Sequence, residues 1–186
     1  MSWFAPSKAP KDGKPFLTAG EICVFAMLGT MMFVSKIIME WLPNIHLLGM
    51  LTMVYTLIYR KKALIPIYLF VLLVMLFNGF SPWLVPYFYV WTVLWGVTML
   101  LPKKMPAVLA AVVYPVVCSL HGLAFGVLYA PAQAVLFHLN FQQMLAWIAA
   151  GFYFDLLHAA GNLAAGLLIL PLTKLLRKLD KHSVRG

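Results

Sequence analysis

The sequence predicts an all-α integral membrane protein, a bundle of six transmembrane helices. Of its 186 residues, 63% are apolar and only 10% are charged. Ordinary soluble domains are about half apolar and about a quarter charged, so a soluble globular chain and a disordered chain are both excluded. The net charge is +9. Because the charges lie between long apolar runs, this excess predicts membrane topology rather than nucleic-acid binding.

The apolar runs define the helices in order, since about 20 apolar residues cross a bilayer. Residues 1–15 are expected to form a basic cytoplasmic tail, residues 16–176 a six-helix membrane domain and residues 177–186 a second basic cytoplasmic tail. Basic clusters or Pro, Asn and Gly turns separate the runs. The first five helices are therefore expected at residues 16–42, 45–59, 63–79, 83–101 and 106–128.

The sixth helix is expected to end near Lys174, and counting back about 20 residues places its start near Phe154. This leaves an apolar segment, residues 130–151, that also carries several Gln, His and Asn side chains. The favoured interpretation is a short helix, a turn at Leu139–Asn140 and a second short helix lying over the bundle. The alternative is one long tilted helix that begins at Phe141.

The basic residues predict the orientation. Thirteen of the 14 lie in the two tails or in alternate connections between helices, and the remaining connections carry none. Basic residues concentrate on the cytoplasmic side, so both termini of this multi-pass cell-membrane protein are expected in the cytoplasm. The thirteen are Lys8, Lys11, Lys14, Arg60, Lys61, Lys62, Lys103, Lys104, Lys174, Arg177, Lys178, Lys181 and Arg185.

The remaining basic residue, Lys36, lies in the outer half of the first helix, one turn before Glu40. An ionisable side chain inside a span is costly and marks a candidate functional site. The alternative is an intrahelical pair with Glu40 or a lysine that reaches the interface. Asp155, His158 and Asn162 share one face of the last helix. Asp155 is expected to contact ligand, to cap the last helix, or both, and the deeper two could instead bond between helices.

An aromatic stripe marks the fourth helix, where Trp83, Tyr87, Trp91 and Trp95 recur every four residues. It spans about 18 Å, which is too deep for an interfacial belt. The stripe is either core packing or the wall of a pocket for an organic ligand. The residues expected to bind substrate at the outer side are Lys36, Glu40, Asn44, Asn78, Tyr87, Trp91, Asp155 and His158.

Motifs for enzyme chemistry are missing. The sequence has no phosphate-binding loop, no HExxH, no GxSxG and no cysteine spacing for a metal, so neither an enzyme nor a metal site is expected. Cys23 and Cys118 lie in apolar runs, as small core residues do. One alternative from another class is a b-type haem protein with His121 or His158 as axial ligands, and another is a purely structural assembly protein.

Four segments resemble the substrate-binding S component of energy-coupling factor (ECF) vitamin transporters, over about residues 16–178. They are WLPNIHLL after the first helix, NGFSPWLVPYFYVW around the fourth, FYFDLLHAAGN in the last, and the small-residue stretch AMLGT in the first. The family docks on its membrane partner through an AxxxA patch in the first helix. The resemblance places that patch at Ala26, Gly29 and Thr30, with Thr30 replacing the second alanine.

The resemblance implies binding of one micronutrient from outside and delivery inward with a transmembrane coupling subunit and two ABC-type ATPase subunits. It implies no cofactor. Among S components the chain is most similar to the cobalamin type. The residues expected to line the pocket are aromatic and nearly uncharged. Such a lining suits a corrinoid, and it suits pyridoxine, a hydroxymethylpyrimidine or a deazapurine almost as well. A small-molecule vitamin, the partner subunits and the lipid bilayer are thus the expected partners, and nucleic acid is not.

Overall fold

The computed structural model describes residues 16–183, and side chains as far as residue 179. The regular elements in this part of the chain are all helical. They are α1 (Ala19–Ile38), α2 (Leu48–Tyr59), the 3-10 helix η1 (Arg60–Ala63), α3 (Leu64–Asn78), the 3-10 helix η2 (Pro82–Leu84), α4 (Tyr87–Leu100), α5 (Ala107–Leu123), α6 (Phe125–Leu136), α7 (Phe141–Gly166) and α8 (Ile169–Ser183).

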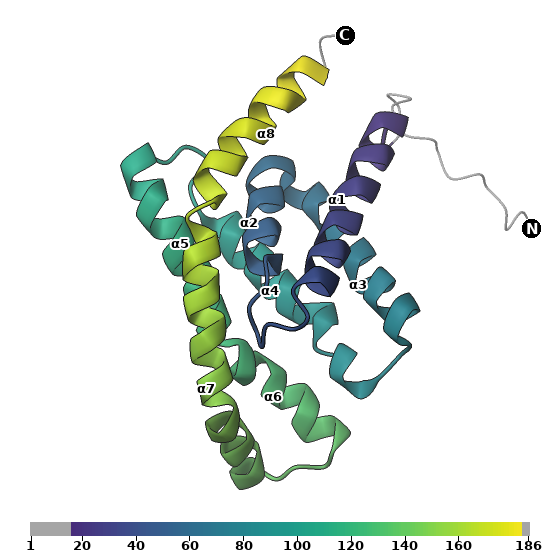
Figure 1. The fold of residues 1–186 in the computed structure, drawn as a ribbon, viewed down its shortest axis with the longest axis vertical. Coiled ribbons are helices and arrows are strands. Elements are labelled where there is room, and N and C mark those ends of the chain that lie inside the picture. Colours follow the sequence, from purple (N-terminus) through teal and green to yellow (C-terminus); the bar gives the residue numbers. More distant parts are fainter. Residues whose placement is uncertain (1–15, 184–186) are drawn as a thin grey trace, which may run out of the picture.

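The predicted all-α membrane bundle is confirmed. Within the described residues, five helical segments are long and apolar enough to cross a membrane. Two of them, residues 48–78 and 107–136, are each divided into two helices. The α2–α3 break comes at Arg60, whose φ of 54° ends α2. The chain runs back and forth between the two ends of the bundle (Figure 1), so α2 and α3 form separate limbs as the sequence predicts.

Two helices begin at capping boxes. In this motif the side chain of the N-cap residue accepts from the backbone N–H three residues later, and the side chain of that later residue accepts from the backbone N–H of the N-cap residue. Thr18 Oγ1 accepts from Glu21 N–H at 3.2 Å, and Glu21 Oε2 accepts from Thr18 N–H at 3.0 Å. Asn140 and Gln143 form the same pair of bonds at the start of α7, both at 2.9 Å. The predicted turn at Leu139–Asn140 is therefore the N-terminal boundary of α7.

The favoured interpretation of residues 130–151 is wrong in its second half. A short helix, α6, does precede the turn, but no second short helix follows it. Instead α7 is continuous over 26 residues from Phe141, which is the alternative that the sequence also allowed. The capping box of Asn140 and Gln143 explains this start.

Two further boundaries differ from expectation. The predicted helix over 106–128 ends at Leu123, and α6 begins at Phe125 in a new direction (Figure 1). The predicted last helix neither starts near Phe154 nor runs unbroken to Lys174. It ends at Gly166, and α8 resumes at Ile169 and continues through Ser183, into the stretch predicted as a tail. Gly166 is one of the close contacts of α7 with α5, since a Cβ there would lie 2.6 Å from Pro115 Cα.

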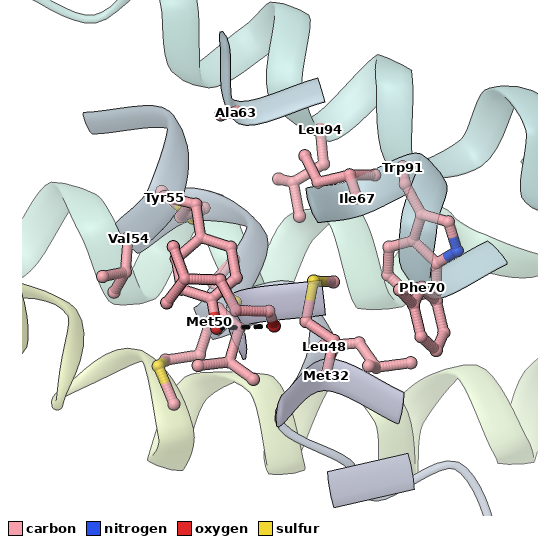
Figure 2. Packing of buried hydrophobic residues seen from close by; sticks show 14 of the residues in the cluster. Met32, Leu48, Met50, Val54, Tyr55, Ala63, Ile67, Phe70, Trp91 and Leu94 are labelled. Carbon is pink, nitrogen blue, oxygen red and sulfur yellow. Dashed lines mark hydrogen bonds between the residues drawn. The ribbon is translucent and has the colours of Figure 1, made fainter. Parts of the chain in front are cut away.

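The core lies between α1, α2, α3 and α4, and Figure 2 shows its large side chains. Tyr55, Phe70 and Trp91 are almost fully buried within it. The Tyr55 hydroxyl donates to the Leu28 carbonyl at 3.2 Å. This bond satisfies a buried polar group that the surrounding apolar side chains could not. This packed unit is the scaffold on which α6 and α7 extend toward the end of the bundle away from α8 (Figure 1).

Apart from Lys36, the described Lys and Arg residues gather at one end of the bundle, called the basic end, and three contacts join their segments there. Lys62 forms a salt bridge of 2.6 Å with Glu21 at the start of α1. Arg60 donates to the Met99 carbonyl at the end of α4 at 2.8 Å. Arg177 of α8 donates to the carbonyl of Leu57 in α2 at 3.1 Å. The opposite end is called the far end, and which end faces the cytoplasm stays a prediction.

Candidate functional site

A cavity of about 270 Å³ opens at the far end between α6, α7 and the α1–α2 connection, and it is called the α6–α7 pocket. Four of its eight lining residues are aromatic, and the others include one carboxylate and one amide. This is the composition expected for a site that binds an organic ring and orients it by a few polar contacts. The lining residues are Asn44, Phe125, Gly126, Tyr129, Trp147, Gly151, Phe154 and Asp155.

Asp155 joins the two helices of the pocket. Its Oδ1 accepts from the N–H of Gly126 in the first turn of α6 at 3.1 Å. The cap residue of α6, Ala124, offers no side-chain acceptor, so Asp155 of α7 supplies the negative charge that a helix N-terminus favours. Asp155 therefore does cap a helix, but it caps α6 rather than its own. The second carboxylate oxygen, Oδ2, remains for another donor.

Asn44 holds the third side of the pocket. It has a φ of 55°, in the left-handed region that asparagine tolerates better than most residues. Its Nδ2 donates to the Phe154 carbonyl at 3.3 Å, which ties the α1–α2 connection to α7. The predicted binding residues Asn44 and Asp155 are thus brought together in one pocket.

Beneath the pocket lies a group of packed rings, called the histidine–tryptophan cluster, made of His46, Trp91, His121, Phe125 and His158. The ring centroids of His46 and His158 are 4.6 Å apart, as are those of Phe125 and His158. Trp91 contacts His46 at 5.9 Å and His121 at 6.0 Å. Phe125 belongs to both the cluster and the pocket wall, so the two are continuous.

The cluster contains buried polar atoms with no hydrogen-bond partner among the described residues. Both ring nitrogens of His158 lack one, although the side chain is only 1% exposed. The same is true of His46 Nδ1, His121 Nδ1 and Trp91 Nε1. Buried polar groups are normally satisfied, and an unsatisfied one costs about 1–3 kcal/mol. A polar ligand that reached these donors and acceptors from the adjoining pocket would satisfy them.

His46 lies in the connection outside the spanning segments, where burial lowers its pKa to about 4. Its imidazole is therefore neutral at pH 7 and can donate from one nitrogen and accept at the other. His46 therefore adds no charge to the cluster beneath the pocket, and the Asp155 carboxyl is the acidic group in the pocket lining.

The other predicted binding residues do not line the pocket. Tyr87 and Trp91 are buried in the core, and each contacts a pocket residue from behind: Tyr87 contacts Tyr129 at 6.3 Å, and Trp91 contacts Phe125 at 6.0 Å. The stripe on α4 therefore supports the wall rather than forming it. His158 lies on the buried face of α7, as predicted, in the cluster beneath the pocket.

Lys36, Glu40 and Asn78 lie apart from the pocket. Lys36 and Glu40 form the intrahelical type of pair that the sequence also allowed, at 3.4 Å. The Lys36 ammonium is 5.9 Å from the centroid of the Trp83 ring. Asn78 is exposed at the end of α3. These contacts account for Lys36 without a ligand.

The predicted docking residues on α1 face two directions. Ala26 and Thr30 are exposed. Gly29 is buried against α3, where an added Cβ would lie 2.9 Å from Leu69 Cδ2. Only Ala26 and Thr30 are therefore available to a partner helix.

The pocket residues that sequence reasoning did not identify are Phe125, Tyr129 and Trp147. All three depend on the break at Ala124 and on the return of the chain at residues 137–140. The available signal was the pair Gly122 and Gly126: a Cβ on Gly122 would lie 2.9 Å from His158 O, and one on Gly126 would collide with the Asp155 carboxylate. Small residues facing a polar face of α7 place α6 beside it.

The haem alternative is not favoured by this geometry. Phe125 packs against both imidazoles, 4.6 Å from His158 and 6.2 Å from His121. The cavity that His121 lines, of about 230 Å³, does not include His158. A porphyrin ligated by both would displace the ring of Phe125.

Comparison with protein-family models, with curated proteins and with solved structures finds no match to this chain.

Proposed function

We propose that the chain is the membrane-embedded substrate-binding subunit of a micronutrient importer of the ECF type, and that the α6–α7 pocket is its binding site. The observation that carries the proposal is the aromatic pocket with Asn44 and Asp155, which adjoins the histidine–tryptophan cluster and its unsatisfied polar atoms through Phe125. A ligand that displaced the Phe125 ring and hydrogen-bonded these atoms would gain affinity from groups that are otherwise costly to bury.

The pocket volume of about 270 Å³ allows the candidate vitamins to be ranked by size. Pockets for drug-sized molecules measure about 300–1,000 Å³, so this one suits a single substituted ring such as pyridoxine or a hydroxymethylpyrimidine. A corrinoid is much larger and would require α6 and the start of α7 to move outward. Cobalamin is therefore the second candidate, although the sequence resemblance favours it.

Calorimetric titration of the purified chain in lipid nanodiscs with pyridoxine, a hydroxymethylpyrimidine and cobalamin tests the proposal. Trp147→Ala should weaken binding about tenfold or more, as truncation of an aromatic anchor does. Trp41→Ala is the matched control, because Trp41 lies 78% exposed outside the pocket and Trp147 is 37% exposed within its wall. Trp91 is unsuitable as a probe, since truncating a fully buried Trp costs about 3–5 kcal/mol of stability.

Saturable binding of one vitamin that falls with Trp147→Ala and not with Trp41→Ala would support the site. Equal affinity in both variants would place the site elsewhere. If none of the vitamins binds and the chain carries a Soret band, the haem alternative replaces this proposal. A chain that binds neither vitamin nor haem is better explained as a structural assembly protein.

A further inference from the structure

A second and larger cavity, of about 520 Å³, lies at the basic end between the start of α5 and α8. It is called the basic cavity. The proposed function does not use it, and it lies at the opposite end of the bundle from the α6–α7 pocket. The residues that matter for its chemistry are Lys103, Lys104, Ala107, Thr173, Lys174 and Arg177.

Four cationic side chains line the basic cavity, and among the side chains described, which end at residue 179, no carboxylate does. Among the side chains described, the salt bridges are Lys36–Glu40 and Lys62–Glu21, and both lie elsewhere. Arg177 is held by the neutral carbonyl of Leu57 at 3.1 Å, which orients the guanidinium without cancelling its charge. The described side chains therefore give the cavity a positive potential that attracts anions.

The start of α5 adds to this potential. Ala107 is the first residue of a 17-residue helix, and the cap residue, Pro106, makes no side-chain hydrogen bond to the first turn. Ala107 and Ala110 line the cavity. Free backbone N–H groups and the positive end of the helix dipole thus meet the four cations, which is the arrangement that binds phosphate oxygens.

Thr173 provides an independent indication of a ligand. The residue is only 3% exposed, it lines the cavity, and its Oγ1 has no hydrogen-bond partner among the described residues. A buried hydroxyl is normally satisfied. An oxyanion in the cavity would accept a hydrogen bond from this hydroxyl.

The surroundings indicate where the anion comes from. α8 is strongly amphipathic: Lys174, Arg177 and Lys178 alternate with a leucine face, as in helices that lie at a membrane interface. Beside the cavity, Val108 is 83% exposed and Leu175 is 51% exposed. Exposed apolar side chains at the rim of a basic cavity are suited to acyl chains below a charged headgroup.

We propose that the basic cavity binds the phosphate headgroup of an acidic glycerophospholipid, with Lys103, Lys104, Lys174 and Arg177 as cationic contacts and the Thr173 hydroxyl and the α5 N-terminus as hydrogen-bond donors. This site would hold α8 against the start of α5 and couple their arrangement to the lipid composition. It stands independently of the substrate proposed for the other pocket.

The test uses the full chain in nanodiscs of phosphatidylcholine containing a minor fraction of phosphatidylglycerol, with native mass spectrometry counting the retained acidic lipid. The double variant Lys103→Gln/Lys174→Gln should reduce retention about 25-fold, since each of the two cations contributes about a factor of five. The matched control is Lys61→Gln/Lys178→Gln, which removes the same charge from exposed residues at the same end that do not line the cavity.

Thr173→Val provides a second probe that leaves charge and volume nearly unchanged, and it should also lower retention, by a smaller factor. Unfolding midpoints in pure phosphatidylcholine check that every variant folds.

Three outcomes would contradict the proposal. Equal loss of phosphatidylglycerol retention in the two double variants would mean a diffuse charge effect and would overturn the site. If inorganic phosphate stabilises the wild-type chain in phosphatidylcholine as much as phosphatidylglycerol does, the ligand is a soluble anion and the headgroup assignment is wrong. If the chain binds neither phosphatidylglycerol nor inorganic phosphate, the anion site and the headgroup assignment are both wrong.

Discussion

At the scale of single residues, Asp155 is the most informative position in the chain. Its carboxylate caps α6 through Gly126 N–H, and it also faces the α6–α7 pocket. The structural role and the proposed ligand contact use different oxygens. They can therefore be separated by substitution.

Asp155→Ala removes the acceptor and leaves the Gly126 N–H buried, so it should lower the free energy of unfolding by about 1–3 kcal/mol. Asp155→Asn keeps an acceptor oxygen and should cost much less. Chemical denaturation of the purified variants measures both. The exposed Gln142→Ala, at the start of the same helix, is the control and should unfold like the wild type. Equal stability of Asp155→Ala and wild type would show that the cap contributes nothing.

Sequence reasoning at this scale found the polar residues that matter on α7 and in the connection after α1. Asp155, His158 and Asn162 are buried on one face of α7, as their spacing predicts. It could not find Phe125, Tyr129 and Trp147, because their convergence depends on a tertiary bend at Ala124. It placed Trp91 and Tyr87 in the wall, whereas periodicity alone cannot tell a core face from a cavity face.

At the scale of elements, the apolar runs predicted which segments are helical, and the errors lie at breaks. Nothing at Ala124 or Leu167 resembles a stop signal, and Pro115 and Pro131 lie inside helices rather than at their ends. The count back from Lys174 failed because α7 is longer than a perpendicular span needs and ends where Gly166 meets Pro115. Such contacts between helices are not encoded in local hydropathy.

Close packing of α5 on α7 leads to a prediction at Gly122. A Cβ there would lie 2.9 Å from His158 O and from Asn162 Nδ2, so Gly122→Ala should destabilise the bundle by about 1–3 kcal/mol. Gly96→Ala on α4 is the matched control, because no atom lies within 4 Å of the added methyl. It should be neutral or stabilising by up to about 1 kcal/mol, as alanine is favoured in a helix. Thermal unfolding in the same detergent compares the two, and a stable Gly122→Ala would mean that the helices separate easily.

The exposed face of α1 leads to a second prediction at this scale, which rests on the proposed partner. Ala26→Trp should reduce vitamin uptake in the presence of a coupling subunit and ATPases, because close helix approach needs small side chains. Vitamin binding by the isolated chain should not change. Gly29 cannot serve here, since its substitution would clash with Leu69 and disturb α3. Normal uptake by Ala26→Trp would remove this face from the docking surface.

At the scale of the whole molecule, the basic residues and the two cavities divide between the same two ends of the bundle. The connections at the basic end carry Arg60, Lys61, Lys62, Lys103 and Lys104, and those at the far end carry no Lys or Arg in the described chain. The two candidate sites follow the same division, with an aromatic pocket that carries no Lys or Arg at one end and the basic cavity at the other. The orientation of the bundle therefore decides which solution each site faces.

The positive-inside rule predicts that the basic end is cytoplasmic. In a background with Cys23→Ala and Cys118→Ala, single cysteines at Phe80 and Asn140 should react with an impermeant thiol reagent added to sealed cells. Both positions are exposed in far-end connections, whereas Lys103 is exposed at the basic end. A cysteine at Lys103 should react only after the membrane is permeabilised. Labelling at Lys103 in sealed cells, with none at Phe80 and Asn140, would invert the bundle. The α6–α7 pocket would then face the cytoplasm, and uptake from outside could not begin there.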